Sequence, residues 1–91
     1  MKKLMARRYV ISGRVQGVGF RYFAERAAKE LGVTGWARNL DDGSVEVHAN
    51  GTRAALDDFE GRLRSGPSFA EVRGFEVTED VETGEREFRI R

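Results

Sequence analysis

The order of two hydrophobic periods constrains this chain most, because apolar residues at every second position predict a strand and apolar residues at helical spacing predict a helix. The strand patterns cover residues 9–15, 33–40, 44–50 and 72–78, and the helix patterns begin at residues 20 and 52. This β-α-β-β-α-β order is typical of the ferredoxin-like fold. We therefore predict an α+β domain with two helices on one face of a mostly antiparallel sheet, to which residues 87–91 add a short C-terminal edge strand.

Glycines and polar residues mark where the predicted elements end. Gly32 follows the last apolar residue of the first helix pattern and is a natural helix stop. Thr52 is a suitable N-cap for the second helix, and the Ser-Gly-Pro run at residues 65–67 ends that helix. The Asp-Asp-Gly run at residues 41–43 predicts a turn, so the strands on either side of it should form a hairpin.

Alternation is cleanest in residues 44–50, where the polar positions are Ser44, Glu46, His48 and Asn50. A strand of this kind buries its apolar face and leaves the other face in solvent. We therefore expect a half-buried strand and give His48 a surface role rather than a catalytic one. Trp36 is expected to serve packing. The charges in residues 79–89 predict a solvated hairpin that turns at residues 83–85.

Composition narrows the chemistry that is available to the chain. The length of 91 residues suits one domain over residues 1–91. The absence of cysteine excludes disulfides, thiolate metal sites and a cysteine nucleophile, and a single histidine excludes a site that needs two imidazoles. We therefore expect neither a metal site nor a cofactor.

Charge and hydropathy bear on partners and location. Sixteen Lys and Arg residues against 15 Asp and Glu residues leave a formal charge of +1, which argues against a general nucleic-acid-binding surface. No apolar run approaches the length of a membrane span, and the N-terminus lacks the apolar core of a secretory signal. We expect a cytoplasmic protein, monomeric by default, with neither a nucleic-acid nor a membrane partner.

The segment from residue 13 to residue 21, Gly-Arg-Val-Gln-Gly-Val-Gly-Phe-Arg, carries the strongest functional signal. It leads from a strand through Gly17 and Gly19 into a helix. Glycines let backbone N–H groups converge on an anion, and a helix start adds unpaired donors and partial positive charge. Arg21 places a cation in the first turn, where the helix dipole disfavours it. A bound anion would relieve that conflict.

The common nucleotide-binding motifs do not fit this segment. Tyr22 stands where the dinucleotide motif needs its third glycine, and no Gly-Lys pair followed by Ser or Thr completes a P-loop. The pattern is therefore compatible with a site for a single phosphate. By itself it also fits a plain strand-to-helix turn with Arg21 in solvent.

Two segments in order resemble the acylphosphatase family. Val15, the loop at residues 16–19 and Phe20-Arg21 resemble its phosphate-binding signature. Its second signature is matched by the Gly-Trp-Ala-Arg-Asn run at residues 35–39, followed by Gly43-Ser44-Val45 and Gly51. Gly66-Pro67, Phe88 and Ile90 also resemble the family, so the resemblance spans nearly the whole chain.

The resemblance implies a function, because acylphosphatases hydrolyse the bond between a carboxyl group and a phosphate. It implies that Asn39 orients the attacking water and that Arg21 holds the phosphoryl oxygens, which makes these two the candidate catalytic residues. It also implies that the phosphate is bound by the backbone amides of Gln16, Gly17, Val18, Gly19 and Phe20. The chemistry agrees, since a carboxylate leaving group needs no general acid and a loose phosphoryl transition state needs positioning and positive charge.

Two other classes of function are compatible with this fold. RNA-recognition domains share this fold but stack bases on aromatic residues in a central strand, and residues 44–50 contain no aromatic residue. A non-catalytic phosphate-binding or accessory module is the second alternative, because similar domains occur at the N-terminus of the carbamoyltransferases of hydrogenase maturation. The further domains and cysteine-rich region of those proteins have no counterpart here, so we expect a free-standing enzyme.

Overall fold

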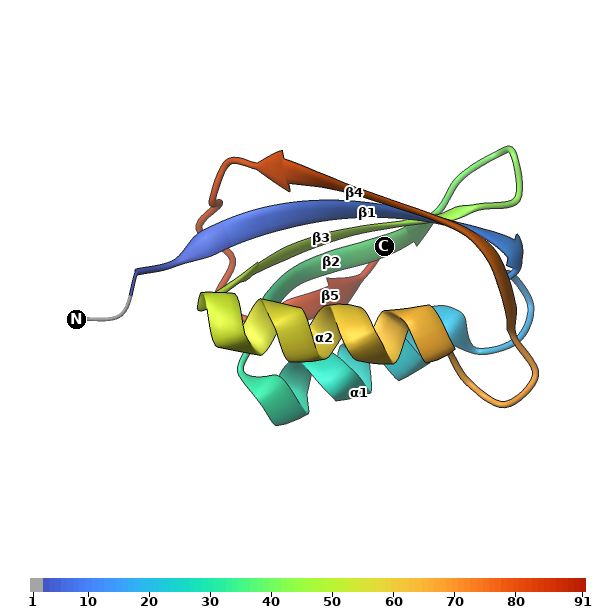
Figure 1. Ribbon diagram of the computed structural model, residues 1–91, viewed down its shortest axis with the longest axis horizontal. Coiled ribbons are helices and arrows are strands. Elements are labelled where there is room, and N and C mark those ends of the chain that lie inside the picture. The colour runs from blue at the N-terminus through green and yellow to red at the C-terminus, as the bar shows by residue number, and fades with distance from the viewer. Residues whose placement is uncertain (1–2) are drawn as a thin grey trace.

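The computed structural model describes residues 3–91, and over that range it has five strands and two helices (Figure 1). In chain order these are β1 (Met5–Arg14), α1 (Phe20–Leu31), β2 (Thr34–Asn39), β3 (Val45–Gly51), α2 (Arg53–Ser65), β4 (Glu71–Asp80) and β5 (Phe88–Ile90). The strands form one sheet in the order β4-β1-β3-β2-β5. The predicted ferredoxin-like α+β fold is confirmed, and so is the extra strand at an edge. No helix within the described residues is long and apolar enough to cross a membrane.

Both helices cover the same face of the sheet, as Figure 1 shows. β1 pairs antiparallel with β3 and β4, β2 pairs antiparallel with β3, and β5 pairs parallel with β2. The core lies between the layers, where α1 contributes Phe20 and three alanines and α2 contributes Leu56, Phe59 and Leu63. The ring of Phe59 meets Tyr9 of β1 and Phe88 of β5 at centroid distances of 6.1 Å and 5.9 Å. Burial of these aromatic rings joins α2 to β1 and to β5.

The predicted helix ends are confirmed. Gly32 ends α1 with a φ of 72°, and its N–H donates to the carbonyl of Ala28. The side chain of Thr52 caps α2 by accepting a hydrogen bond from the N–H of Ala55 at 3.2 Å. Gly66 ends α2 with a φ of 67°. Local residue preference was enough to place these boundaries, because a cap acts on its own turn.

The prediction that β3 is half-buried is wrong. All of its residues are buried, and His48, expected at the surface, is 2% exposed. The cause is the connection between β4 and β5. These strands lie at opposite edges of the sheet, so the connection must cross the face that the helices leave open. On that face the Thr83 hydroxyl lies 2.8 Å from Nε2 of His48, and the Thr83 N–H donates to Oδ1 of Asn50 at 3.0 Å.

The predicted hairpin at residues 79–89 is wrong for the same reason. β4 pairs with β1, whereas β5 pairs with β2, so no hairpin joins β4 to β5. The packing role expected for Trp36 is confirmed, because its ring stacks on His48 at a centroid distance of 5.7 Å.

Charged residues also cover the polar face of β3. Both carboxylate oxygens of Glu46 are used, one by Arg8 and one by Arg38 at 2.6 Å. Burial opposes ionisation of Glu46, but the hydrogen bonds from Arg38 and Arg8 outweigh it and hold the pKa of Glu46 below its ordinary value. The polar face of β3 is therefore an internal layer of paired groups.

Candidate active site

A small pocket of about 100 Å³ lies where the end of β1, the end of β2 and the start of α1 meet. Its lining residues are Val15, Gly17, Gly19, Phe20, Arg21, Tyr22 and Asn39. The pocket therefore combines both predicted catalytic residues with the glycines of the predicted loop. Arg21 and Asn39 come from different elements, and the fold brings them to the same end of the sheet.

The loop owes its shape to two glycines in the left-handed region. Gly17 has a φ of 74° and Gly19 a φ of 79°, while Val18 between them does not have a positive φ. Alternation between right- and left-handed residues turns successive N–H groups toward one side and makes a concave anion site. A Cβ at Gly17 or Gly19 would meet no atom within 4 Å. The glycines are thus needed for backbone conformation and not for space.

The start of α1 offers backbone N–H groups to an external hydrogen-bond acceptor. Gly19 is its N-cap, provides no side-chain hydrogen bond, and is followed by a first turn without acidic residues. α2 differs, because Thr52 caps it. The free N–H groups and dipole of α1 therefore leave positive potential at the pocket, and the guanidinium of Arg21 adds to it.

The Arg21 side chain is held by the C-terminal segment. Its Nη1 donates to the backbone oxygen of Arg91 at 3.0 Å, and the N–H of Arg91 donates to the carbonyl of Ala37 in β2 at 2.8 Å. This support was missed from sequence, because no local pattern connects Arg21 to a residue at the far end of the chain.

Asn39 is the last residue of β2 and is exposed. Its neighbour Arg38 reaches the opposite face of the sheet, where it pairs with Glu46. Arg38 and Asn39 therefore point to opposite faces, as successive side chains of a strand do.

Two of the predicted phosphate-binding residues do not line the pocket. The side-chain amide of Gln16 donates to the backbone of Leu40 and Ser44, and Val18 packs against the core. For these two residues only the backbone remains available to an anion, as the resemblance implied. Sequence reasoning did not single out Tyr22, which borders the pocket with 69% of its surface exposed. Its position beside Arg21 in the first turn of α1 was the available signal.

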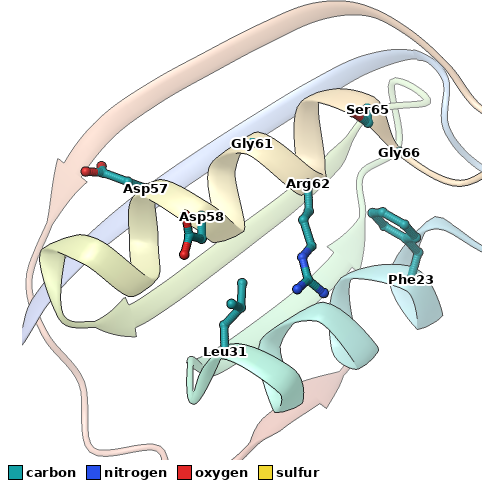
Figure 2. A pocket seen from close by; sticks show the side chains of 8 residues that line it. All are labelled: Phe23, Leu31, Asp57, Asp58, Gly61, Arg62, Ser65 and Gly66. Carbon is teal, nitrogen blue, oxygen red and sulfur yellow. The ribbon is translucent and has the colours of Figure 1, made fainter.

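A larger hollow of about 590 Å³ lies elsewhere, between α1 and α2 (Figure 2). Its floor and rim include Phe23, Leu31 and Asp58, and Arg62 reaches across from α2 toward α1. The guanidinium of Arg62 is paired there with Glu30 at 2.5 Å. None of the residues singled out from sequence for phosphate chemistry lines this groove, so its size does not connect it with the predicted site.

Fold and site together define the class of this protein: a ferredoxin-like domain with a glycine-rich loop and an arginine at the start of its first helix. The family model described as Acylphosphatase matches residues 7–90. The chain belongs to the acylphosphatase family of hydrolases, as the two signatures suggested.

Individual relatives agree with this assignment. An acylphosphatase of Solibacter usitatus is 55% identical over 86 residues, which cover 94% of this chain and 90% of the relative. One of Thermotoga petrophila is 46% identical over 91 residues, covering 100% of this chain and 98% of the relative. The crystal structure of the Bacillus subtilis acylphosphatase superposes with a TM-score of 0.92 at 40% identity and covers 96% of this chain and 98% of that one.

A longer protein shares the fold. Full-length HypF in a phosphate- and nucleotide-bound form superposes with a TM-score of 0.90 at 23% identity, over 100% of this chain but 12% of HypF. At that identity the likeness concerns the fold alone.

Proposed function

We propose that this chain hydrolyses acyl phosphates to a carboxylate and inorganic phosphate by direct attack of water on phosphorus. The observation that carries the proposal is the shared pocket, in which Arg21 and Asn39 meet Gly17 and Gly19. At about 100 Å³ the pocket suits a phosphoryl group and leaves the acyl group outside, beside Tyr22.

In this proposal the loop and Arg21 bind the phosphoryl oxygens. Backbone N–H groups of residues 16–20 donate to them, and the planar guanidinium adds charge-assisted hydrogen bonds. Negative charge spreads over the equatorial oxygens in the loose transition state of phosphoryl transfer. Donors that already point at these oxygens stabilise that charge without reorganisation.

Asn39 places the nucleophile. Its Oδ1 accepts a hydrogen bond from a water molecule and fixes the direction of the water lone pair toward phosphorus. The bond from water oxygen to phosphorus forms as the bond from phosphorus to the carboxyl oxygen breaks. The bond electrons leave with the carboxylate, and the water proton passes to the phosphate product or to solvent. Because the carboxylate is a good leaving group, no general acid is needed, and we propose an enzyme that uses neither metal nor cofactor. We also propose that the enzyme is monomeric and cytoplasmic.

The test is hydrolysis of benzoyl phosphate in EDTA by the wild type and by Asn39→Ala, with Thr83→Val, which alters a hydroxyl on the opposite face, as control. We expect turnover by the wild type and by the control. Asn39→Ala should lose about 100-fold or more in kcat while inorganic phosphate inhibits it almost as well, because misplacing a reactant has costs of that order. A folded wild type without turnover would leave the non-catalytic phosphate-binding module as the function, and turnover that EDTA abolishes would refute the metal-free mechanism.

A further inference from the structure

The two halves of the proposed site come from separate segments, the loop at residues 16–20 and the end of β2. Their relative position must be set by contacts between those segments. The side chain of Gln16 makes such a contact, because its Nε2 donates to the carbonyl of Leu40 at 2.8 Å and to the carbonyl of Ser44 at 2.9 Å. Leu40 directly follows Asn39 in the sequence.

These two hydrogen bonds require a nitrogen that can donate twice. A glutamine nitrogen carries two protons, and both are used here on carbonyl oxygens, which only accept. The orientation of the amide is thereby determined, because its oxygen could not replace the nitrogen at either partner. A methionine would fill similar space without any donor.

Gln16 holds both ends of the turn between β2 and β3. The N–H of Leu40 donates to the carbonyl of Ser44 at 2.8 Å, and the N–H of Gly43 donates to the carbonyl of Leu40 at 3.2 Å. The carboxylate of Asp42 accepts from the N–H of Ser44 at 2.9 Å. The turn is thus braced internally, and the Gln16 amide ties it as a unit to the loop.

The loop is anchored by residues other than Gln16, whereas Asn39 occupies the last position of the β2–β3 ladder, opposite Val45. Val15 and Phe20 are buried to 1% and 2% exposure, and Val18 packs against the core between them. Asn39 is exposed and ends its strand, next to the turn that Gln16 holds. Loss of the Gln16 amide should therefore shift the Asn39 side of the pocket more than the loop side.

We propose that Gln16 is a positioning residue, whose side-chain amide sets the place of Asn39 relative to the phosphate loop by holding the Leu40–Ser44 turn. This inference rests on the proposed function, in which Asn39 orients the attacking water. It adds a second task to Gln16, whose backbone N–H belongs to the anion site.

A double-mutant cycle tests the proposal. Gln16→Met is made in the wild type and in Asn39→Ala, and kcat for benzoyl phosphate, inhibition by inorganic phosphate and Tm are measured for all four proteins. Gln16→Ala replaces the methionine variant if that variant does not fold. Thr52→Val is the matched control, because it removes a hydrogen bond between side chain and backbone at the start of α2, beyond the other end of β3.

We expect Gln16→Met to lower kcat by about 10- to 100-fold, the cost of a displaced reactant, and to change the phosphate inhibition constant by less than about threefold. In the Asn39→Ala background the same substitution should lower kcat by less than about twofold. The reason is that Gln16 is proposed to act through the position of the Asn39 side chain, which this background lacks, so the two losses do not add. Thr52→Val should lower Tm without changing kcat.

Three results would overturn the inference while leaving the proposed function intact. They are an unchanged kcat in Gln16→Met, an equal loss of kcat in the Asn39→Ala background, and a loss of phosphate inhibition that matches the loss of kcat. Wild-type kcat in Asn39→Ala would instead remove the role proposed for Asn39, and the inference about Gln16 with it.

Discussion

Replacement of Gly19 by alanine separates a conformational requirement from a packing one. Gly19 has a φ of 79° and a ψ of 21°, and an added Cβ would meet no atom within 4 Å. An L-residue in this region costs roughly 1–2 kcal/mol, and the stiffer unfolded chain offsets roughly 0.4–1 kcal/mol of that. The net loss is therefore about 1 kcal/mol, which corresponds to ~4–8 °C in Tm for a domain of this size.

The matched control is Gly61→Ala. Gly61 lies inside α2, where an added Cβ also meets no atom within 4 Å and the backbone is not left-handed. Alanine is the better helix former, so this variant should gain about 0.5–1 kcal/mol in the free energy of unfolding. The two substitutions are chemically identical and should have opposite signs.

The assay combines urea unfolding with benzoyl phosphate turnover. If the loop keeps its conformation in Gly19→Ala, stability falls by the amount above. If the loop relaxes, the N–H groups no longer converge and kcat/KM falls by about 10-fold or more, as expected for a lost oxyanion donor. Wild-type stability together with wild-type kcat/KM would refute the reasoning, because one of the two must change.

Two other predictions follow from charge. Arg21→Ala should lower kcat/KM by about 10- to 100-fold and weaken phosphate inhibition in parallel, since a charged hydrogen bond is worth about 1.5–3 kcal/mol in ground and transition states alike; inhibition by phosphate that matches the wild type would remove Arg21 from the site. The pKa of Glu46 is held below its ordinary value, so its ion pairs stabilise the fold above that value and their contribution is lost as the pH falls through the lowered pKa. The difference in urea midpoint between the wild type and Glu46→Gln should therefore be constant above the ordinary pKa of 4.5 and narrow as the pH falls below it. A difference that does not vary with pH would contradict this.

Local sequence alone determined which segments became strands and helices and where the helices end. Hydrophobic period, the Thr52 cap and the stop at Gly32 act within one or two turns of chain, so they can be read without knowing the fold. The glycine loop belongs to the same group, since glycine permits the left-handed conformation that Gly17 and Gly19 adopt. This is why the fold class and the location of the loop were predictable.

The tertiary structure determined which residues cover or contact each strand and helix. Sheet order sends the connection between β4 and β5 over β3, which buries His48 and Asn50 although their alternation predicted solvent. It also brings Asn39 beside Arg21, and Gln16 beside the turn that follows Asn39. Alternation tells which side chains share a face of a strand, but not what covers that face. Which residues cover a face depends on segments far apart in the chain. The pairing of these segments is set only when the whole core is buried at once.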